Sequence, residues 1–118
     1  YTSPPEAGLR AFGRAYAGWA YSGAFYRRRL YEVLGYGSPA ELLAAWEADH
    51  LAWDANDLLC MLRTWQDADV SRNGMYRGNF ARALSGIRAK TIVMPCDEDM
   101  YFTLEECVYE ATLIPGAQ

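Results

Sequence analysis

Apolar side chains recur every three or four residues along the first part of the chain. A stripe of such positions runs from Phe12 to Val33, and Gly23 lies on it. This spacing is typical of a helix that buries one face, and the glycine marks either a bend or a close approach of another backbone. We therefore expect a long helix that starts at the capping box "SPPE" (residues 3–6) and ends at "GYGS" (residues 35–38).

Two further helices follow, each with its own start signal. Ser38 precedes Glu41 by three residues, which is a capping box that opens a second helix. Asp54 or Asn56 can cap a third helix, and leucines and a tryptophan recur behind them at helical spacing. The turn-forming sequence "VSRNG" (residues 70–74) ends this third helix.

The texture of the sequence changes after a short helix predicted at residues 79–84. "TIVMPC" (residues 91–96) is a continuous apolar run with β-branched side chains rather than an alternating one. Such a run favours a strand buried on both faces, as in a parallel sheet. Thr103 then opens a third capping box before a last helix, so three acids (residues 97–99) fall in a strand-to-helix loop. One strand needs neighbours, so we expect the chain to be a piece of a longer protein.

Composition and charge exclude several classes of function. The 118 residues are 52% hydrophobic, which is ample for a folded core. A net charge of -4 argues against nucleic acid and anionic membrane surfaces as partners, and no apolar stretch is long enough to span a membrane. The three cysteines are odd in number and lack CxxC spacing, so we expect a reducing compartment and a cytoplasmic location.

The three acids after the predicted strand are the first candidates for chemistry. Asp97, Glu98 and Asp99 lie at the carboxyl end of a strand, where open α/β sheets gather functional groups. The alternative is that one acid caps the next helix and the others are solvated turn residues. The loop lacks the glycine and distal glutamate of an EF-hand and no zinc-binding pattern accompanies it, so we predict no metal site.

The single histidine and the cysteines are weaker candidates. His50 lies near a predicted helix end, where a local hydrogen-bonding role is commoner than general-base catalysis. Cys60 and Cys96 sit in apolar runs, and because burial raises a thiol pKa we interpret both as packing residues.

Four segments in order carry a resemblance to a known family: "PPEAGLRAFGRAYAGWAYS", "WDANDLLCMLRTWQDADVS", "ALSGIRAKTIVMPCDEDMYFTLEE" and "LIPGAQ". Together they resemble the homoserine O-acetyltransferase family of the α/β-hydrolase superfamily, which includes related acetyl esterases. The resemblance implies an α/β fold class, specifically an α/β-hydrolase fold fragment that is mostly helical cap followed by one core β-strand and a helix. Residues 1–76 would be the cap (lid) region, and residues 77–118 would be part of the core.

The resemblance also implies roles for individual residues. In such hydrolases the triad runs Ser, Asp, His along the chain, with the serine on a G-x-S-x-G elbow. No such elbow is present and His50 precedes the acid, so the serine and the histidine would lie outside this chain. The family's position for the catalytic acid falls on Asp99. Cys96 and Thr103 depart from the family pattern, so Asp97 is kept as the fallback. Arg14 matches the arginine that would face the carboxylate of an acyl acceptor.

The function implied is acetyl transfer or acetyl ester hydrolysis, with this chain alone inactive. The partners would be a small-molecule acyl donor and an alcohol or water; acetyl-CoA would be the donor for a transferase, and no cofactor would be bound. The resemblance also implies a homodimer formed through the cap helices. The alternative is a non-catalytic helical interaction module that dimerises through the face of Phe12, Tyr16 and Trp19.

Overall fold

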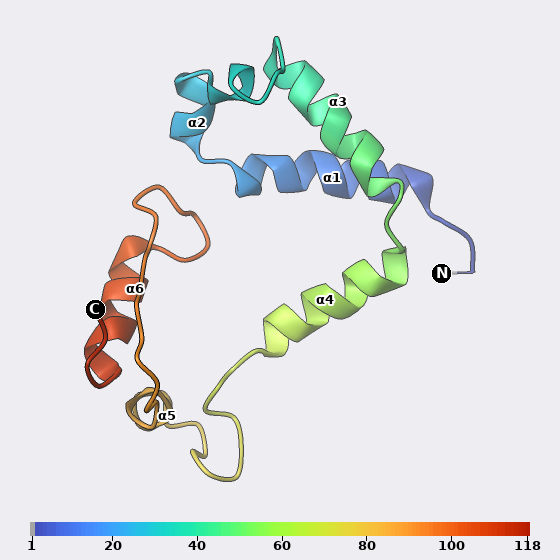
Figure 1. Ribbon diagram of the computed structural model, residues 1–118. Helices are drawn as coiled ribbons and strands as arrows, with labels where there is room; N and C mark the ends of the chain where they lie inside the picture. Colours follow the sequence, from blue (N-terminus) through green and yellow to red (C-terminus); the bar gives the residue numbers. More distant parts are fainter. Residues whose placement is uncertain (1) are drawn as a thin grey trace. The chain divides into compact units, whose positions relative to one another are not determined.

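A computed structural model describes residues 2–118, which divide into two compact units at Gln66 and Asp67 (Figure 1). Helices are the only regular elements in this described range, and no strand is assigned in it. The first unit holds α1 (Glu6–Ala20), α2 (Gly23–Arg27), the 3-10 helix η1 (Leu30–Glu32), α3 (Pro39–His50) and α4 (Ala55–Asp67), which ends at the boundary; the second holds α5 (Phe80–Ser85) and α6 (Leu104–Leu113).

The start of α1 differs from the predicted capping box. The helix begins at Glu6 with Pro5 as its N-cap residue, and no side chain caps it. Main-chain carbonyls accept from the first amides instead, because Glu6 N–H donates to Pro4 O (3.1 Å) and Leu9 N–H to Pro5 O (2.9 Å). Pro5 disfavours helical backbone at Pro4, so a helix cannot begin at Ser3.

The predicted long first helix is broken into three pieces. Tyr21 and Ser22 are extended, and the Ser22 hydroxyl accepts a hydrogen bond from Phe25 N–H at 3.1 Å to cap α2. A serine that can cap a new helix competes with continuing the old one. Of the two meanings offered for Gly23, the bend is therefore correct.

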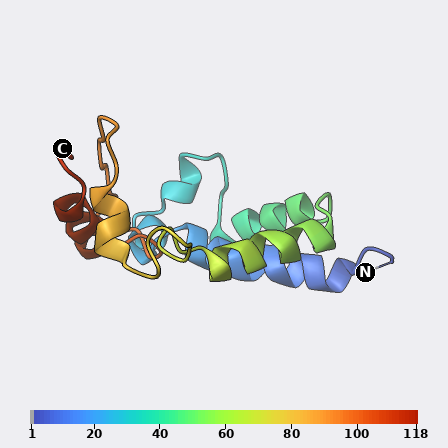
Figure 2. The same cartoon turned by 90° about the horizontal axis from the view of Figure 1, so that it is seen from below.

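α1 and α3 pack against each other, as Figures 1 and 2 show. The buried positions of α1 are Leu9, Gly13 and Ala17, which are spaced by four residues and form one narrow face. At Gly13 the approach is close, because a Cβ atom there would lie 2.7 Å from the carbonyl oxygen of Trp46 on α3. The absence of a side chain at this position is what allows the two helices to meet.

The starts of α3 and α4 confirm the sequence signals. Ser38 Oγ accepts from Glu41 N–H at 3.2 Å. Asp54, rather than Asn56, caps α4, because its Oδ1 accepts from the amides of Asn56 (2.7 Å) and Asp57 (3.2 Å). Along α4 only Leu58 is buried, and four apolar side chains stay exposed: Leu59, Met61, Leu62 and Trp65.

The predicted buried strand is not a strand in the described part of the chain. Residues 91–96 carry no strand assignment, and Ile92 and Met94 are 62% and 86% exposed. Val93 N–H donates to Gln118 O (2.7 Å), and Gln118 N–H donates to Thr91 O (3.2 Å). A parallel pair of strands repeats this pair of hydrogen bonds along its length. Here a single residue, Gln118, lies opposite the segment, so the pattern does not continue and no strand forms. The helical structure thus corrects the predicted β-strand within this chain.

The helices of the second unit begin where the sequence predicts. Asn79 caps α5 by accepting from Arg82 N–H at 2.9 Å, and Thr103 caps α6. Within residues 2–118 no helix combines the length and the apolar character that crossing a membrane requires.

Candidate active site

The acid loop between residues 96 and 103 is organised by one carboxylate. Asp99 Oδ1 accepts hydrogen bonds from the amides of Tyr101 (2.7 Å) and Phe102 (2.9 Å), and Asp99 N–H donates to Cys96 O (3.3 Å). Aspartate that binds amides two and three residues ahead forms a local turn. None of the three acids caps α6, because Thr103 has that position.

These hydrogen bonds also set the charge of Asp99. The amides of Phe102 and then Tyr101 hold the pKa of the Asp99 carboxyl below its ordinary value of 3.8, because they stabilise the charged form. Asp99 is therefore an anion at neutral pH. Such a group can accept a hydrogen bond from an imidazolium, but it cannot serve as a general acid.

The neighbouring acids lie differently. Asp97 is exposed in the turn that it forms with Glu98, whereas Asp99 is partly buried. The amides of Tyr101 and Phe102 hold the Asp99 carboxylate in a defined orientation, and no such contact is seen for Asp97 in the described residues. The assignment of Asp99 as the catalytic acid, with Asp97 as the fallback, stays a prediction.

Arg14, the candidate for substrate binding, lies on the outside of α1. Its Nη1 donates to Glu47 Oε1 of α3 at 2.7 Å, and its side chain is 62% exposed. The pair joins the two helices that meet at Gly13. The structure gives Arg14 a carboxylate partner from its own chain, and its role toward a substrate stays a prediction.

His50 lies inside the contact between α1 and α3 and is 4% exposed. Its Nδ1 lies 2.8 Å from the carbonyl oxygen of Trp46, which requires the proton to be on Nδ1. The ring stacks on Trp46 and Trp53, with centroids 5.5 Å apart in both cases, and Phe12 lies at the same distance. These contacts match the expected local hydrogen-bonding role.

The cysteines differ from their predicted packing role. Cys60 and Cys96 are exposed in this chain, Cys107 is half-buried, and all three are free thiols. Cys60 lies on a face of α4 that nothing in its own unit covers, and Cys96 follows the exposed segment described above. Among residues 2–118 no three histidine, cysteine or acidic side chains converge as they would around a metal ion.

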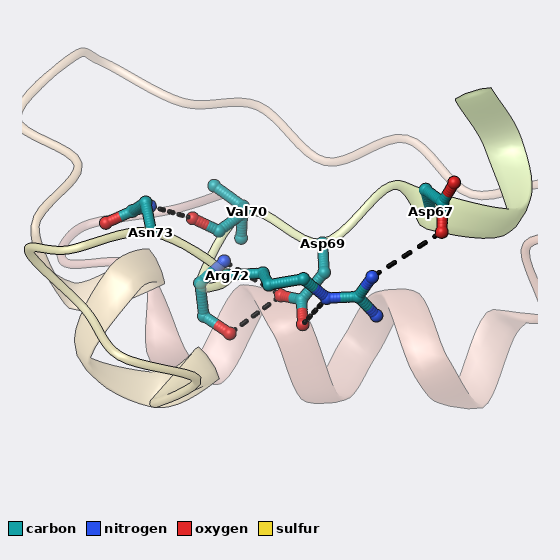
Figure 3. A network of polar contacts seen from close by, with 6 residues as sticks. Asp67, Asp69, Val70, Arg72 and Asn73 are labelled. Carbon is teal, nitrogen blue, oxygen red and sulfur yellow. Dashed lines mark hydrogen bonds and ion pairs between the residues drawn. The ribbon is translucent and has the colours of Figure 1, made fainter.

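A polar network that was not predicted from the sequence stabilises the loop after α4, at residues 67–73 (Figure 3). Ser71, which is 1% exposed, donates to Asp69 Oδ1 from its amide (2.8 Å) and its hydroxyl (2.7 Å). These bonds, the hydroxyl first, lower the pKa of Asp69. Arg72 forms ion pairs with two aspartates: its Nη1 lies 3.6 Å from Asp67 Oδ1, and its Nε lies 4.0 Å from Asp69 Oδ2. The signal was an aspartate two residues before a serine, in a stretch interpreted only as a helix stop.

Curated relatives match nearly the whole chain, although no known protein-family profile does. A probable esterase of Corynebacterium glutamicum is 36% identical over an alignment of 121 positions, which covers 100% of this chain and 34% of the relative. The ethyl acetate hydrolase of Pseudomonas veronii is 34% identical over an alignment of 118 positions, which covers 99% of this chain and 33% of that enzyme. The chain therefore spans about a third of the length of the curated relatives that it matches.

Solved structures agree with these relatives. An acetylester hydrolase from Corynebacterium glutamicum superposes with a TM-score of 0.89 at 36% identity, over 95% of this chain and 32% of the other. The acetyl esterase MekB gives a TM-score of 0.87 at 34% identity, over 96% of this chain and 32% of the other. The chain is homologous to acetyl-ester hydrolases.

The homology supports the esterase side of the resemblance drawn from the sequence. Neither the two curated relatives nor the two solved structures are described as a homoserine O-acetyltransferase.

Proposed function

We propose that the protein to which this chain belongs hydrolyses small acetyl esters, with Asp99 as the acid of a Ser-His-Asp triad. The observation that carries the proposal is the anchored carboxylate of Asp99, with amides at 2.7 and 2.9 Å on Oδ1, in a chain homologous to acetyl-ester hydrolases. An anion held in one orientation is what a triad needs beside its histidine.

The mechanism assigns one task to this chain. A serine attacks the acetyl carbonyl while a histidine takes its proton, the alcohol leaves, and water then releases acetate from the acetyl-enzyme. Asp99 accepts from the imidazole Nδ1–H, fixes the tautomer and stabilises the imidazolium. The serine and the histidine come from other parts of the protein, because the chain has no G-x-S-x-G and Nδ1 of its only histidine faces Trp46 O.

The core strand of the α/β-hydrolase fold belongs to the same proposal. Residues 91–96 would become a strand when parallel neighbours extend the ladder that Gln118 begins, which would also cover Ile92 and Met94. Residues 1–76 would form the cap and residues 77–118 would contribute to the core. A cytoplasmic location stays a prediction.

The homodimer through the cap helices also stays a prediction. The face first suggested for it is partly used within the chain, because Tyr16 packs edge-on against Trp46 and Phe12 lies beside His50. Trp19, at 55% exposure, is the member of that face that stays on the surface.

Water is favoured over an alcohol as the acyl acceptor. A transferase that uses acetyl-CoA and homoserine would need a cation for the carboxylate of the acceptor, and Arg14 is the residue matched to that task. Its guanidinium already has a carboxylate partner in its own chain, because Nη1 donates to Glu47 Oε1 at 2.7 Å. Ester hydrolysis needs no such cation, so it agrees better with this geometry.

The proposal is tested by a matched pair of substitutions in the complete protein. Asp99→Asn should lower kcat for a chromogenic acetate ester about 10⁴-fold, as loss of a triad acid does. Asp97→Asn removes a charge from the same loop and should leave the rate within about twofold. If Asp97→Asn is the damaging change, the acid must be reassigned, and two near-normal rates would remove this loop from catalysis.

A further inference from the structure

The acid loop is joined to α6 through a second hydrogen-bonded residue. Thr103 Oγ1 accepts from Glu106 N–H at 3.4 Å and donates to Glu106 Oε2 at 2.9 Å. The main chain of Thr103 also belongs to the helix, because its carbonyl accepts from Cys107 N–H at 3.0 Å. The threonine therefore has both its hydroxyl and its carbonyl committed to the first turn of α6.

The residues bonded to Asp99 come directly before this cap. Asp99 Oδ1 binds the amides of Tyr101 and Phe102, and the next residue in the chain is Thr103. Fixing the backbone at the cap restricts the peptide that carries the Phe102 amide, since only the two soft dihedral angles of Phe102 separate that peptide plane from the next one, which leads into Thr103. The orientation of the acid thus depends on where α6 begins.

We propose that Thr103 is a positioning residue for Asp99. Its hydroxyl holds the first turn of α6 so that the amides of Tyr101 and Phe102 keep Asp99 Oδ1, which leaves Oδ2 to meet the histidine. Oδ2 has no hydrogen-bond partner in the described part of the chain. This inference rests on the proposed function, because it assigns Thr103 a role only through the triad acid.

The test compares two identical substitutions on α6 in the complete protein. Thr103→Val removes the capping hydroxyl while keeping the shape of the side chain. The control is Thr112→Val near the other end of the helix, where the hydroxyl donates only to Tyr109 O at 2.6 Å. Thr103→Ser restores the hydroxyl and should rescue the rate. For each variant, kcat and KM for a chromogenic acetate ester, the pH profile of kcat/KM and the melting temperature are measured.

Thr103→Val should lower kcat about tenfold with KM little changed, since even small misplacement of a catalytic group is costly. A looser carboxylate stabilises the imidazolium less, so the acidic limb of kcat/KM should move to lower pH. Thr112→Val should match the parent protein in both measurements. A purely structural role would lower the melting temperature but leave kcat per active site and the pH profile unchanged, and that result would overturn the proposal.

Failure of this inference can be told apart from failure of the proposed function. If Asp99→Asn abolishes turnover while Thr103→Val behaves like Thr112→Val, only the positioning role falls. If Asp99→Asn is itself near normal, the triad assignment falls, and the role of Thr103 falls with it.

Discussion

The contact between α1 and α3 makes a prediction about two glycines of one helix. Gly13 and Gly18 both lie in α1, where alanine is the better helix former by roughly 0.5–1 kcal/mol. A Cβ atom at Gly18 would meet nothing within 4 Å. At Gly13 it would lie 2.7 Å from Trp46 O and 2.9 Å from Nδ1 and Cγ of His50. The same substitution should therefore have opposite effects.

The magnitude follows from the atoms that must move. The carbonyl oxygen of Trp46 belongs to the backbone of α3, and the His50 ring is hydrogen-bonded to that same oxygen. Neither group can therefore move without moving the other. Forcing a methyl group into packed space costs about 1–3 kcal/mol. After the gain in helix propensity, Gly13→Ala should lower the free energy of unfolding by up to about 2.5 kcal/mol. Gly18→Ala should raise it by up to about 1 kcal/mol.

Urea unfolding followed by tryptophan fluorescence measures both variants. Trp46 and Trp53 stack on His50 beside Gly13, so their emission reports the contact directly. Equal m-values would show that the native and unfolded states are comparable across the series. If Gly13→Ala is as stabilising as Gly18→Ala, the close approach of the two helices is not present in solution and the reasoning fails.

Two further predictions concern charged side chains. Arg14→Ala should change the free energy of unfolding by less than about 1 kcal/mol in urea titrations, because the Arg14 side chain of its pair with Glu47 is 62% exposed. It should also leave kcat/KM for an uncharged acetate ester unchanged, and a loss above about tenfold would place Arg14 in the substrate site. Hydrogen bonds from the amides of Asn56 and Asp57 lower the pKa of Asp54 from 3.8, so its contribution is complete above the unfolded pKa and is lost as pH falls through the folded pKa. Unfolding titrations below about pH 4 should show this loss, and Asp54→Asn should flatten it; an unchanged slope would contradict the assignment.

The helix starts were largely predictable from the sequence because caps act over short distances. Ser38 and Asp54 each bind an amide three residues ahead, and Thr103 does the same. Such contacts form from neighbouring residues whatever the rest of the chain does. Where the local signals conflicted, prediction failed: Pro5 moved the start of α1 away from Ser3, and the Ser22 cap divided the expected long helix.

The acid loop was found by pattern, and its internal geometry came from the structure. An acid at the end of an apolar run and before a capped helix could be read from the residues, and the family resemblance selected Asp99 among three. Which amides its carboxylate accepts depends on the path of the loop backbone. The same holds for the Asp69 and Ser71 network, whose buried serine has no distinctive mark beyond its spacing.

The sequence by itself determined where most helices begin, the acidic character of the loop and a resemblance to a family that includes acetyl esterases. Only the tertiary structure decided that α3 packs closely against α1 at Gly13, that His50 is buried and that Arg14 donates a hydrogen bond to Glu47. Arg14 and Glu47 are 33 residues apart, and Gly13 and Trp46 are separated by a similar stretch of chain, so no local pattern encodes these contacts. It also decided that residues 91–96 carry no strand, because a strand exists only through the backbone partners that a ladder supplies.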